Sequence, residues 1–247
     1  MVKKNKLPAR WEQYSPMGEV VQGTRFIPFK TPLKKDLCSK YFADREQWFT
    51  PEILQSMLPN LKLVIDLTFT DRYYSKDEFL NHDIQHVKIK CPGGGGKKIP
   101  KYSLVTMFNE VVNEFRNSKA GQNEENLIGV HCTHGLNRTG YFICNYMVTY
   151  NGFTPNDAFE AFETARGYKI ERTFYKCDIL KRFHKSLVVE DSITNHVGRK
   201  SSRRRRNKKR TTSFGRSFSS KREPLTSEVT STSRFRRRPR SKHIQQI

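Results

Sequence analysis

One segment of the chain runs from an apolar strand through a short polar loop into a buried helix. Asn126–Cys132 (NLIGVHC) has the length and composition of a buried strand, and Arg138–Tyr150 (RTGYFICNYMVTY) those of a helix buried on most sides. Only THGLN separates the two. A strand that passes directly into a helix is the unit from which α/β sheets are built, so this segment restricts the chain to that class.

The alternation of strands and helices continues on both sides of this segment. Further strands or extended segments are predicted at Arg25–Leu33, Leu61–Leu67 and His86–Lys90. Helices are predicted at 50–58, 103–117, 154–166 and 174–187, and two of them open with Thr-Pro, a common helix start. We therefore expect one sheet with helices on both of its faces.

Basic residues are concentrated toward the C-terminus. Residues 199–247 contain 18 Lys and Arg against 2 Asp and Glu, so they carry +16 of the net charge of +22. Hydrophobic periodicity also stops near residue 190, and the sequence beyond it has too few apolar residues to form a core. We predict a folded domain at 1–190 and a disordered Arg/Ser-rich basic tail at 191–247.

The tail contains two blocks of basic residues, Arg203–Arg210 and Arg234–Arg240. Such blocks neutralise the phosphates of nucleic acids, and the first block is also typical of a nuclear localisation signal. We expect a nuclear protein whose tail binds RNA, or RNP and splicing proteins. A solvated tail without a partner is the alternative.

Cysteine usage and the lack of long apolar segments limit where the protein works. The cysteines are widely spaced and form no CxxC pair, unlike a secreted disulfide framework or a zinc ribbon. No apolar run resembles a signal peptide or a membrane span. We therefore expect an intracellular protein without stable membrane association. We also expect four inert buried thiols: Cys38, Cys91, Cys144 and Cys177.

Three roles compete for the remaining cysteine, Cys132: metal ligand, inert buried thiol or nucleophile. A loop that curls over a helix N-terminus directs backbone N–H groups and the helix dipole toward an anion. The same field lowers the pKa of a thiol in the loop from about 8.5 into the range of roughly 3.5–7.5. The Cys-x5-Arg spacing therefore favours a nucleophile that attacks phosphorus and forms a phosphocysteine intermediate.

The residues after the cysteine suit the same chemistry. The amides of residues 133–138 can hold three phosphate oxygens, and Arg138 can add a planar, two-pronged contact. Thr139 places a hydroxyl where it can donate to the sulfur and make it a better leaving group. Gly135 and Gly140 suit a tight loop and a close approach of loop and helix.

Zinc binding by His131, Cys132 and His134 is the competing interpretation of this segment. The three side chains are crowded together, and no second ligand cluster with matching spacing occurs. We therefore expect no metal. If Cys132 is instead the nucleophile, His131 orients the loop and His134 lines the anion pocket.

The loop HCTHGLNRTG resembles the signature of the cysteine-dependent phosphatases. Its inner residues, THGLN, are similar to the branch that acts on RNA 5′ ends. That branch comprises the triphosphatase domains of metazoan capping enzymes and the RNA/RNP complex-interacting phosphatases, which are atypical dual-specificity phosphatases. Three further segments resemble the same group: Arg10–Leu33, Leu63–Tyr74 and Arg166–Arg172. The resemblance covers about residues 8–185.

This resemblance implies a twisted, protein-tyrosine-phosphatase-like sheet, no metal or cofactor, and removal of the γ and then the β phosphate from 5′-triphosphate RNA. Cys132 matches the nucleophile, and Arg172 matches an arginine near the triphosphate. Arg72 is either structural or a substrate contact. The phosphate-binding loop is matched by Thr133, His134, Gly135, Leu136, Asn137 and Arg138.

Related phosphatases that cleave phosphotyrosine or phosphoserine use an aspartate in a mobile loop to protonate the leaving oxygen. The corresponding loop here, Cys91–Pro100 (CPGGGGKKIP), contains no Asp or Glu. A leaving phenol has a pKa of about 10 and a leaving phosphate a second pKa of about 6, so a phosphoanhydride needs little acid help. Asp66 and Asp71 remain candidate acids, and for Asp66 the alternative role is to anchor a loop through hydrogen bonds. Lys97 and Lys98 are either polyphosphate contacts or part of a solvated loop.

An RNA 5′-polyphosphatase is the favoured interpretation, and a dual-specificity protein phosphatase is the main alternative. A phosphoinositide phosphatase is less favoured, because THGLN lacks the lysines that such enzymes often carry in this loop. A non-enzymatic RNA-binding module would need neither Cys132 nor Thr139. A capping enzyme is excluded, since no Lys-x-Asp-Gly motif occurs.

Overall fold

The computed structural model describes residues 6–93 and 98–183, and the predicted tail at 191–247 lies outside them. Within this part of the chain, parallel strands form a sheet in the order β1-β4-β2-β3. Their bounds are β1 Phe26–Lys30, β2 Leu61–Asp66, β3 Gln85–Lys88 and β4 Leu127–Cys132. The predicted α/β class with one central sheet is confirmed.

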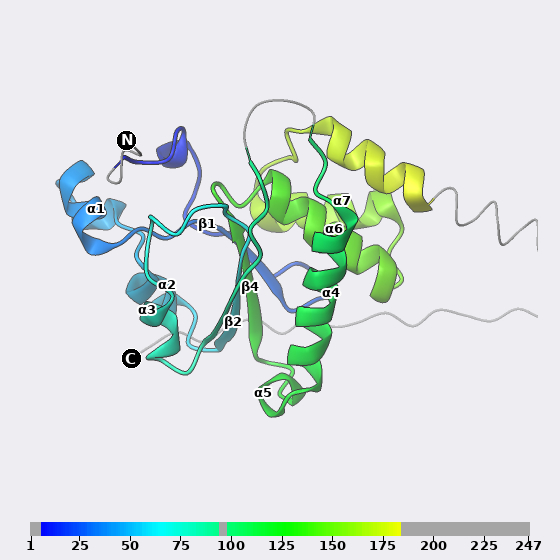
Figure 1. Cartoon of the computed structure of the whole chain (residues 1–247), viewed down its shortest axis with the longest axis horizontal. Helices are drawn as coiled ribbons and strands as arrows, with labels where there is room; N and C mark the ends of the chain where they lie inside the picture. The colour runs from blue at the N-terminus through cyan, green and yellow to red at the C-terminus, as the bar shows by residue number, and fades with distance from the viewer. Residues whose placement is uncertain (1–5, 94–97, 184–247) are drawn as a thin grey trace, which may run out of the picture. The chain divides into compact units, whose positions relative to one another are not determined.

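Helices cover both faces of this sheet, as predicted (Figure 1). One side carries α1 (Lys35–Tyr41), α2 (Pro51–Met57) and α3 (Asp77–Leu80). The other side carries α4 (Tyr102–Asn117), α6 (Asn137–Tyr150), α7 (Pro155–Arg166) and a helical segment at 173–183. The shorter elements are η1 (Trp11–Gln13), η2 (Arg45–Gln47) and α5 (Lys119–Gln122).

Alternating side chains of the central strands divide the core between the two faces. Leu63 and Ile65 of β2 pack on the side of α4, α6 and α7. The intervening Val64 packs with Leu54 of α2 and Phe79 of α3. Because both faces of the sheet are buried at its centre, strands β2 and β4 are apolar along nearly their whole length, as their sequences indicate.

The two Thr-Pro helix starts are confirmed. Thr50 Oγ1 accepts a hydrogen bond from the amide of Ile53 at 3.2 Å, and α2 begins at the following proline. Thr154 Oγ1 accepts from the amide of Asp157, also at 3.2 Å, at the start of α7. Each cap satisfies an amide that has no partner within its own helix, which is why the sequence signal locates these starts.

Some elements differ from the sequence predictions. The extended segment around Pro28 is strand β1, which tolerates a proline because β1 lies at the edge of the sheet. Strand β3 begins at Gln85 and ends at Lys88, earlier than the predicted 86–90. The short elements η1 and α1 were not predicted, since segments of this length carry little periodicity.

The cysteines are free thiols. The prediction that Cys177 is buried was wrong: it is exposed, because the buried stripe of the 173–183 helix runs through Tyr175 and Ile179 instead. The other three cysteines predicted to be inert are buried. None of the helices in the described residues has the length and apolar character needed to cross a membrane.

Candidate active site

The loop that follows Cys132 joins β4 to α6. Helix α6 begins at Asn137, one residue before the predicted start. Gly135 has a φ of 69°, and a Cβ at this position would lie 2.3 Å from the carbonyl oxygen of Phe29. Only glycine fits so crowded a left-handed position, and it lets the chain turn back over the first turn of α6.

Arg138 is held by contacts from three segments. Its Nη1 donates to the carbonyl oxygens of Leu67 and Cys91, both at 2.8 Å, and its Nη2 donates to Thr133 Oγ1 at 3.0 Å. A Cβ at Gly93 would lie 3.2 Å from the guanidinium carbon. The first residues of the glycine-rich loop therefore border the arginine, whose planar group is fixed before any phosphate arrives.

Cys132 lies at the base of this loop and is only 3% exposed. Burial acts to raise the pKa of its thiol. The charge of Arg138, the hydroxyl of Thr139 and the amides of Thr139 and His134 outweigh burial and lower this pKa to about 7. About half of the molecules therefore carry a thiolate at neutral pH, as a nucleophile requires.

Thr139 is fully buried, and its hydroxyl has no hydrogen-bond partner within the described residues. The hydroxyl nevertheless acts to lower the pKa of the Cys132 thiol, as its predicted role near the sulfur requires. At Gly140 a Cβ would lie 2.6 Å from a ring carbon of Phe162 on α7. Glycine thus lets α6 and α7 pack closely, and this packing holds the start of α6 in place.

His131 and Cys132 are consecutive in β4, so their side chains lie on opposite faces of the sheet. The His131 ring stacks on Phe29, with centroids 5.1 Å apart, and its Nε2 lies 2.7 Å from the hydroxyl of Tyr74. This placement fits the predicted role of His131 in orienting the loop and does not fit a shared zinc. Across residues 6–93 and 98–183, no group of three or more His, Cys, Asp or Glu side chains could hold a metal.

Residues from outside the loop contact its members His134 and Asn137. His134 donates through Nε2 to the carbonyl of Ala9 at 2.7 Å, and its own carbonyl accepts from Arg166 at 3.1 Å. Asn137 Oδ1 accepts from the backbone amide of Arg172 at 2.8 Å. The fold thus brings the predicted residues His134, Asn137 and Arg172 together at the loop.

The side chains of several predicted loop residues support the loop rather than line a phosphate site. His134 and Asn137 are engaged as described, and the side chain of Leu136 is 1% exposed. What these residues offer a phosphate is the backbone amide at the start of a helix. Of the two lysines in the glycine-rich loop, Lys97 lies outside the described residues and Lys98 is exposed.

The two candidate acids are held ionised. Asp66 accepts a hydrogen bond from the amide of Thr68 at 2.7 Å and pairs with Lys88 at 2.7 Å. Burial acts to raise the pKa of Asp66, but His131, Lys88 and the Thr68 amide together hold this pKa below the usual range. The hydrogen bond from Lys90 and the charge of Lys88 likewise lower the pKa of Asp71. Of its two predicted roles, Asp66 therefore fits that of a loop anchor.

Glu171 is a third carboxylate near the loop, which sequence reasoning did not single out. It accepts from the Tyr14 hydroxyl at 2.6 Å, from Arg10 at 2.9 Å and from Asn137 Nδ2 at 3.3 Å. Burial acts to raise its pKa, but the three hydrogen bonds hold it below the ordinary value. Glu171 therefore ties the N-terminal segment to the loop as an anion.

Arg166 also escaped the sequence analysis as a site residue. It is 1% exposed on α7, donates to the Ser15 hydroxyl at 2.7 Å, and supports the loop carbonyl described above. Burial lowers the pKa of its guanidinium to about 10. The sequence did contain one indication that Arg166 is buried. Arg166 continues the apolar stripe of Phe159 and Phe162 at helical spacing, where a charged residue is unusual.

The sequence matches the family described as "Dual specificity phosphatase, catalytic domain" over residues 50–185, which is more than half of the chain. The chain belongs to the dual-specificity phosphatase family. Both Cys132 and Arg138 fall within the matched residues. The family match therefore includes the whole loop from Cys132 to Arg138.

Curated relatives confirm the resemblance to the RNA/RNP complex-interacting phosphatases. The chain is 43% identical over 175 residues to the RNA/RNP complex-1-interacting phosphatase homolog of Caenorhabditis elegans, covering 69% of this chain and 73% of that protein. It is 43% identical over 183 residues to the RNA/RNP complex-1-interacting phosphatase of Rattus norvegicus, covering 72% of this chain but 54% of the rat protein. A tyrosine-protein phosphatase of Autographa californica nuclear polyhedrosis virus is 39% identical over 173 residues, with coverages of 70% and 98%.

Solved structures agree on the fold. A mutant form of Tk-PTP superimposes with a TM-score of 0.50 at 16% identity, covering 70% of this chain and 98% of that one. A variant of kinase associated phosphatase gives a TM-score of 0.50 at 13% identity, with coverages of 69% and 93%. At this identity the match supports the protein-tyrosine-phosphatase-like fold and no finer conclusion.

Proposed function

We propose that this phosphatase is a metal-independent RNA 5′-polyphosphatase that removes the γ and then the β phosphate from 5′-triphosphate RNA. The Cys132 thiolate attacks the terminal phosphorus, and the bond from that phosphorus to the bridging oxygen breaks. The loop amides and Arg138 hold the three outer oxygens throughout. Water then hydrolyses the phosphocysteine to inorganic phosphate, and the Thr139 hydroxyl donates to the departing sulfur.

The observation that carries this proposal is the lack, among the described residues, of a protonated carboxyl group beside the loop. The segment Cys91–Pro100 contains no acid, and Asp66, Asp71 and Glu171 are each held ionised by cations or hydrogen-bond donors. Without a general acid, expelling a phenol or an alcohol loses about 10²–10⁴-fold in rate. A departing phosphate is a far weaker base and suffers little from this loss.

The names of the relatives support the same substrate class. The Caenorhabditis elegans and Rattus norvegicus proteins are both named for RNA/RNP complexes. This support is independent of the acid argument, since it comes from similarity along the chain and not from leaving-group chemistry. Together the two favour an RNA end over a phosphoprotein.

A dual-specificity protein phosphatase is the second candidate, favoured by the name of the viral tyrosine-protein phosphatase. In that case Asp71, which is 66% exposed, would have to leave Lys88 and Lys90 and supply the proton. The change Asp71→Asn separates the two candidates. It should not lower kcat for triphosphate RNA, and it should lower kcat for a phosphotyrosine peptide only if the second candidate holds.

The decisive test of the proposed reaction uses RNA labelled separately at the γ and β phosphates, incubated with excess chelator. Wild type should release both labels, and Cys132→Ser should release neither. A metal requirement, or release that survives in Cys132→Ser, would overturn the proposal. Release of the γ label alone would limit the activity to a triphosphatase.

We also infer a nuclear location and an RNA-binding role for the basic tail, on the strength of its composition alone. Deleting residues 199–247 should weaken RNA binding, lower its salt dependence and reduce nuclear accumulation. Catalysis on a short triphosphorylated substrate should persist, because the catalytic residues lie outside this segment. Unchanged RNA affinity and nuclear import would contradict the inference.

A further inference from the structure

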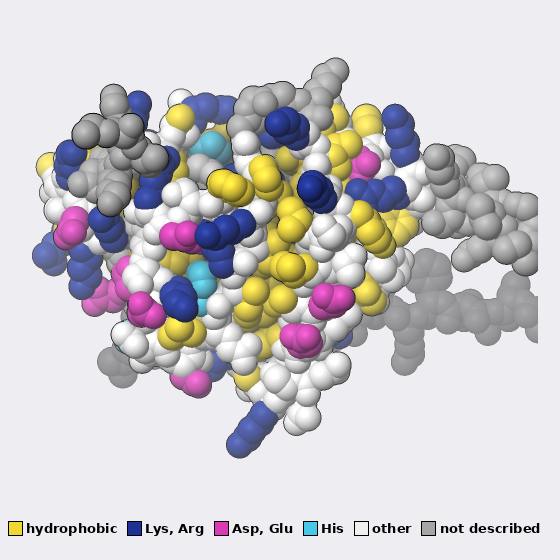
Figure 2. Space-filling model, in the orientation of Figure 1, with side chains coloured by type: hydrophobic (Ala, Val, Ile, Leu, Met, Phe, Trp, Pro, Cys, Tyr) yellow, Lys and Arg dark blue, Asp and Glu magenta, His cyan; other side chains and the backbone are white. Residues whose placement is uncertain are grey.

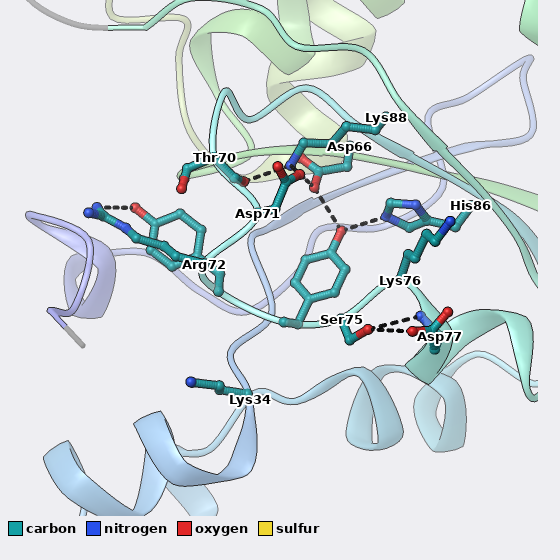
Figure 3. Close-up of a pocket in the computed structure, with 12 residues that line it drawn as sticks. Lys34, Asp66, Thr70, Asp71, Arg72, Ser75, Lys76, Asp77, His86 and Lys88 are labelled. Carbon is teal, nitrogen blue, oxygen red and sulfur yellow. Dashed lines mark hydrogen bonds and ion pairs between the residues drawn. The ribbon is translucent and has the colours of Figure 1, made fainter. Parts of the chain in front are cut away.

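A pocket of about 940 Å³ is lined by residues outside the catalytic loop, and the proposed chemistry makes no use of it. It opens near the carboxyl ends of β2 and β3, and Figure 3 shows how the side chains from several elements line it. The lining side chains include Lys34, Asp66, Asp71, Arg72, Lys76 and Lys88. In Figure 2, basic, acidic and histidine side chains gather on this part of the face.

Two chain segments connect the pocket to the catalytic loop. Thr31 donates its amide to the carbonyl of Thr133 in the loop at 3.2 Å, and Leu67 accepts from the catalytic arginine. The segments meet again at the pocket, where the amide of Lys34 donates to the carbonyl of Tyr73 at 2.7 Å. Three residues of extended chain span about 10 Å, so the pocket wall lies within a few nucleotides of the phosphate site.

Two of the three carboxylates that line the pocket are paired with lysines. Asp66 pairs with Lys88 at 2.7 Å, and Asp71 pairs with Lys88 at 3.3 Å and with Lys90 at 3.1 Å. Asp77 accepts a hydrogen bond from a serine hydroxyl at 2.9 Å. The paired groups lie together on one side in Figure 3, where dashed lines join them.

Three further cations of the pocket form no ion pair within the described residues: Lys34, Arg72 and Lys76. Arg72 donates from Nη2 to the Tyr73 hydroxyl and lies 4.9 Å from the centre of that ring. Its Nε is buried and has no hydrogen-bond partner in the described part of the chain. An unused donor and unpaired cations suit an anionic ligand with several phosphates.

An aromatic side chain lies on the segment that leads from the catalytic arginine to the pocket. Phe69 is 61% exposed, although large apolar side chains are usually buried. Exposed aromatic rings next to cations are the means by which many proteins stack unpaired bases without sequence preference. In the sequence Phe69 lies between Leu67, whose carbonyl accepts from Arg138, and Thr70 of the pocket lining, so it suits a nucleotide of an unpaired strand.

We propose that this pocket binds the single-stranded RNA that follows the 5′ phosphates, an inference that rests on the proposed function. Lys34, Arg72 and Lys76 contact phosphodiester groups downstream of the reacting end, and Phe69 stacks on a base. The pocket is thus a binding site for the RNA body and takes no part in the chemistry. It distinguishes a triphosphorylated RNA from a free nucleoside triphosphate.

The test compares two double variants of the full chain that each remove two positive charges. Lys34→Gln with Lys76→Gln alters the pocket. Lys35→Gln with Lys119→Gln is the matched control, since Lys35 pairs with Glu52 outside the pocket and Lys119 lies on α5. Each is assayed on a triphosphorylated hexaribonucleotide and on a nucleoside triphosphate. The basic tail is present in all variants and cancels in the comparison.

The pocket variant should raise KM for the hexanucleotide about tenfold and leave its kcat unchanged. It should leave both constants for the nucleoside triphosphate unchanged, and its salt slope for RNA binding should fall by about 1.4. The control should match wild type on both substrates. An unchanged hexanucleotide KM in the pocket variant would overturn the proposal. So would an equal rise in the control, or an equal rise for the nucleoside triphosphate.

A binding measurement keeps this result separate from the proposed reaction. Fluorescence anisotropy with a 5′-hydroxyl hexaribonucleotide reports the pocket without any hydrolysis. If wild type fails to hydrolyse triphosphate RNA but the pocket variant still loses about tenfold in affinity, the reaction is wrong and the RNA site stands. If wild type hydrolyses triphosphate RNA and both variants bind equally, the RNA site is wrong and the reaction stands. Preference for a phosphopeptide of equal charge would also overturn the RNA site.

Discussion

Cys132 and Cys144 belong to one unit, β4 and α6, and both are buried on the same side of the sheet, but their chemistry is opposite. Cys132 precedes the first turn of α6, where Arg138 and its neighbours overcome burial and lower the thiol pKa to about 7. Cys144 lies in the middle of α6, donates to the carbonyl of Ala158 at 3.3 Å, and has a pKa that burial raises well above the ordinary value. The difference shows that the start of the helix and the arginine, rather than burial, determine which thiol reacts.

The largest effect is expected when the two thiols are removed separately. Cys132→Ser should lower kcat/KM for a small phosphate ester by about 10⁴-fold or more, because the nucleophile is lost. Cys144→Ser should stay within about threefold of wild type. Thermal melts of both variants check that they are folded. Similar losses of activity in two folded variants would break the comparison.

The next effect is a difference in reactivity within the wild-type protein. Cys91 is buried beside the same arginine, but burial raises its pKa to about 11. At pH 7 the thiolate fraction of Cys132 should exceed that of Cys91 by about 10³–10⁴-fold, since each pKa unit is a factor of ten. Iodoacetamide labelling followed by mass spectrometry measures both, with the exposed Cys177 as the accessible reference.

The labelling of Cys132 should rise with pH and reach half of its maximum near 7, because the thiolate is the reactive form. A midpoint at the ordinary value of about 8.5 would contradict the assigned role of the helix start.

Replacing the catalytic arginine should have a smaller but still large effect. Arg138→Lys keeps the charge but loses the planar pair of donors, so kcat/KM should fall by about 10²–10³-fold. Inhibition by inorganic phosphate should weaken in parallel. Arg45→Lys, on the short turn η2, is the matched control and should leave both unchanged. An active Arg138→Lys enzyme would show that a point charge suffices.

The smallest effect is expected at Thr139. Thr139→Val removes the hydroxyl beside the sulfur, so kcat should fall about tenfold and the labelling midpoint of Cys132 should move to higher pH. The control is Thr149→Val on the same helix, where the hydroxyl only bonds to the Asn145 carbonyl at 2.7 Å. If both variants behave alike, the hydroxyl of Thr139 acts through packing and not on the sulfur.

The sequence predicted those parts of the site that depend on neighbours along the chain. The apolar run before Cys132, the spacing to Arg138 and the Thr-Pro helix starts are local patterns, and the structure confirms each. The start of α6 was misplaced by one residue only. Local patterns therefore sufficed for the catalytic loop and for the α/β class.

Contacts between distant segments could not be predicted in this way. Arg166 lies under a loop that is 32 positions away in sequence, and Tyr74 reaches His131 across 57 positions. The RNA pocket depends on the meeting of Lys34 with the segment around Tyr73. Such pairings follow from the strand order of the sheet, which periodicity does not report.

An activated thiolate without a general acid should restrict this phosphatase to phosphoanhydrides. The most direct measurement compares kcat/KM for triphosphate RNA with kcat/KM for a phosphotyrosine peptide, at neutral pH with chelator present. We predict a ratio of about 10² or more in favour of the RNA, because only the peptide needs a proton on its leaving group. Comparable efficiency on the two substrates would contradict the claim.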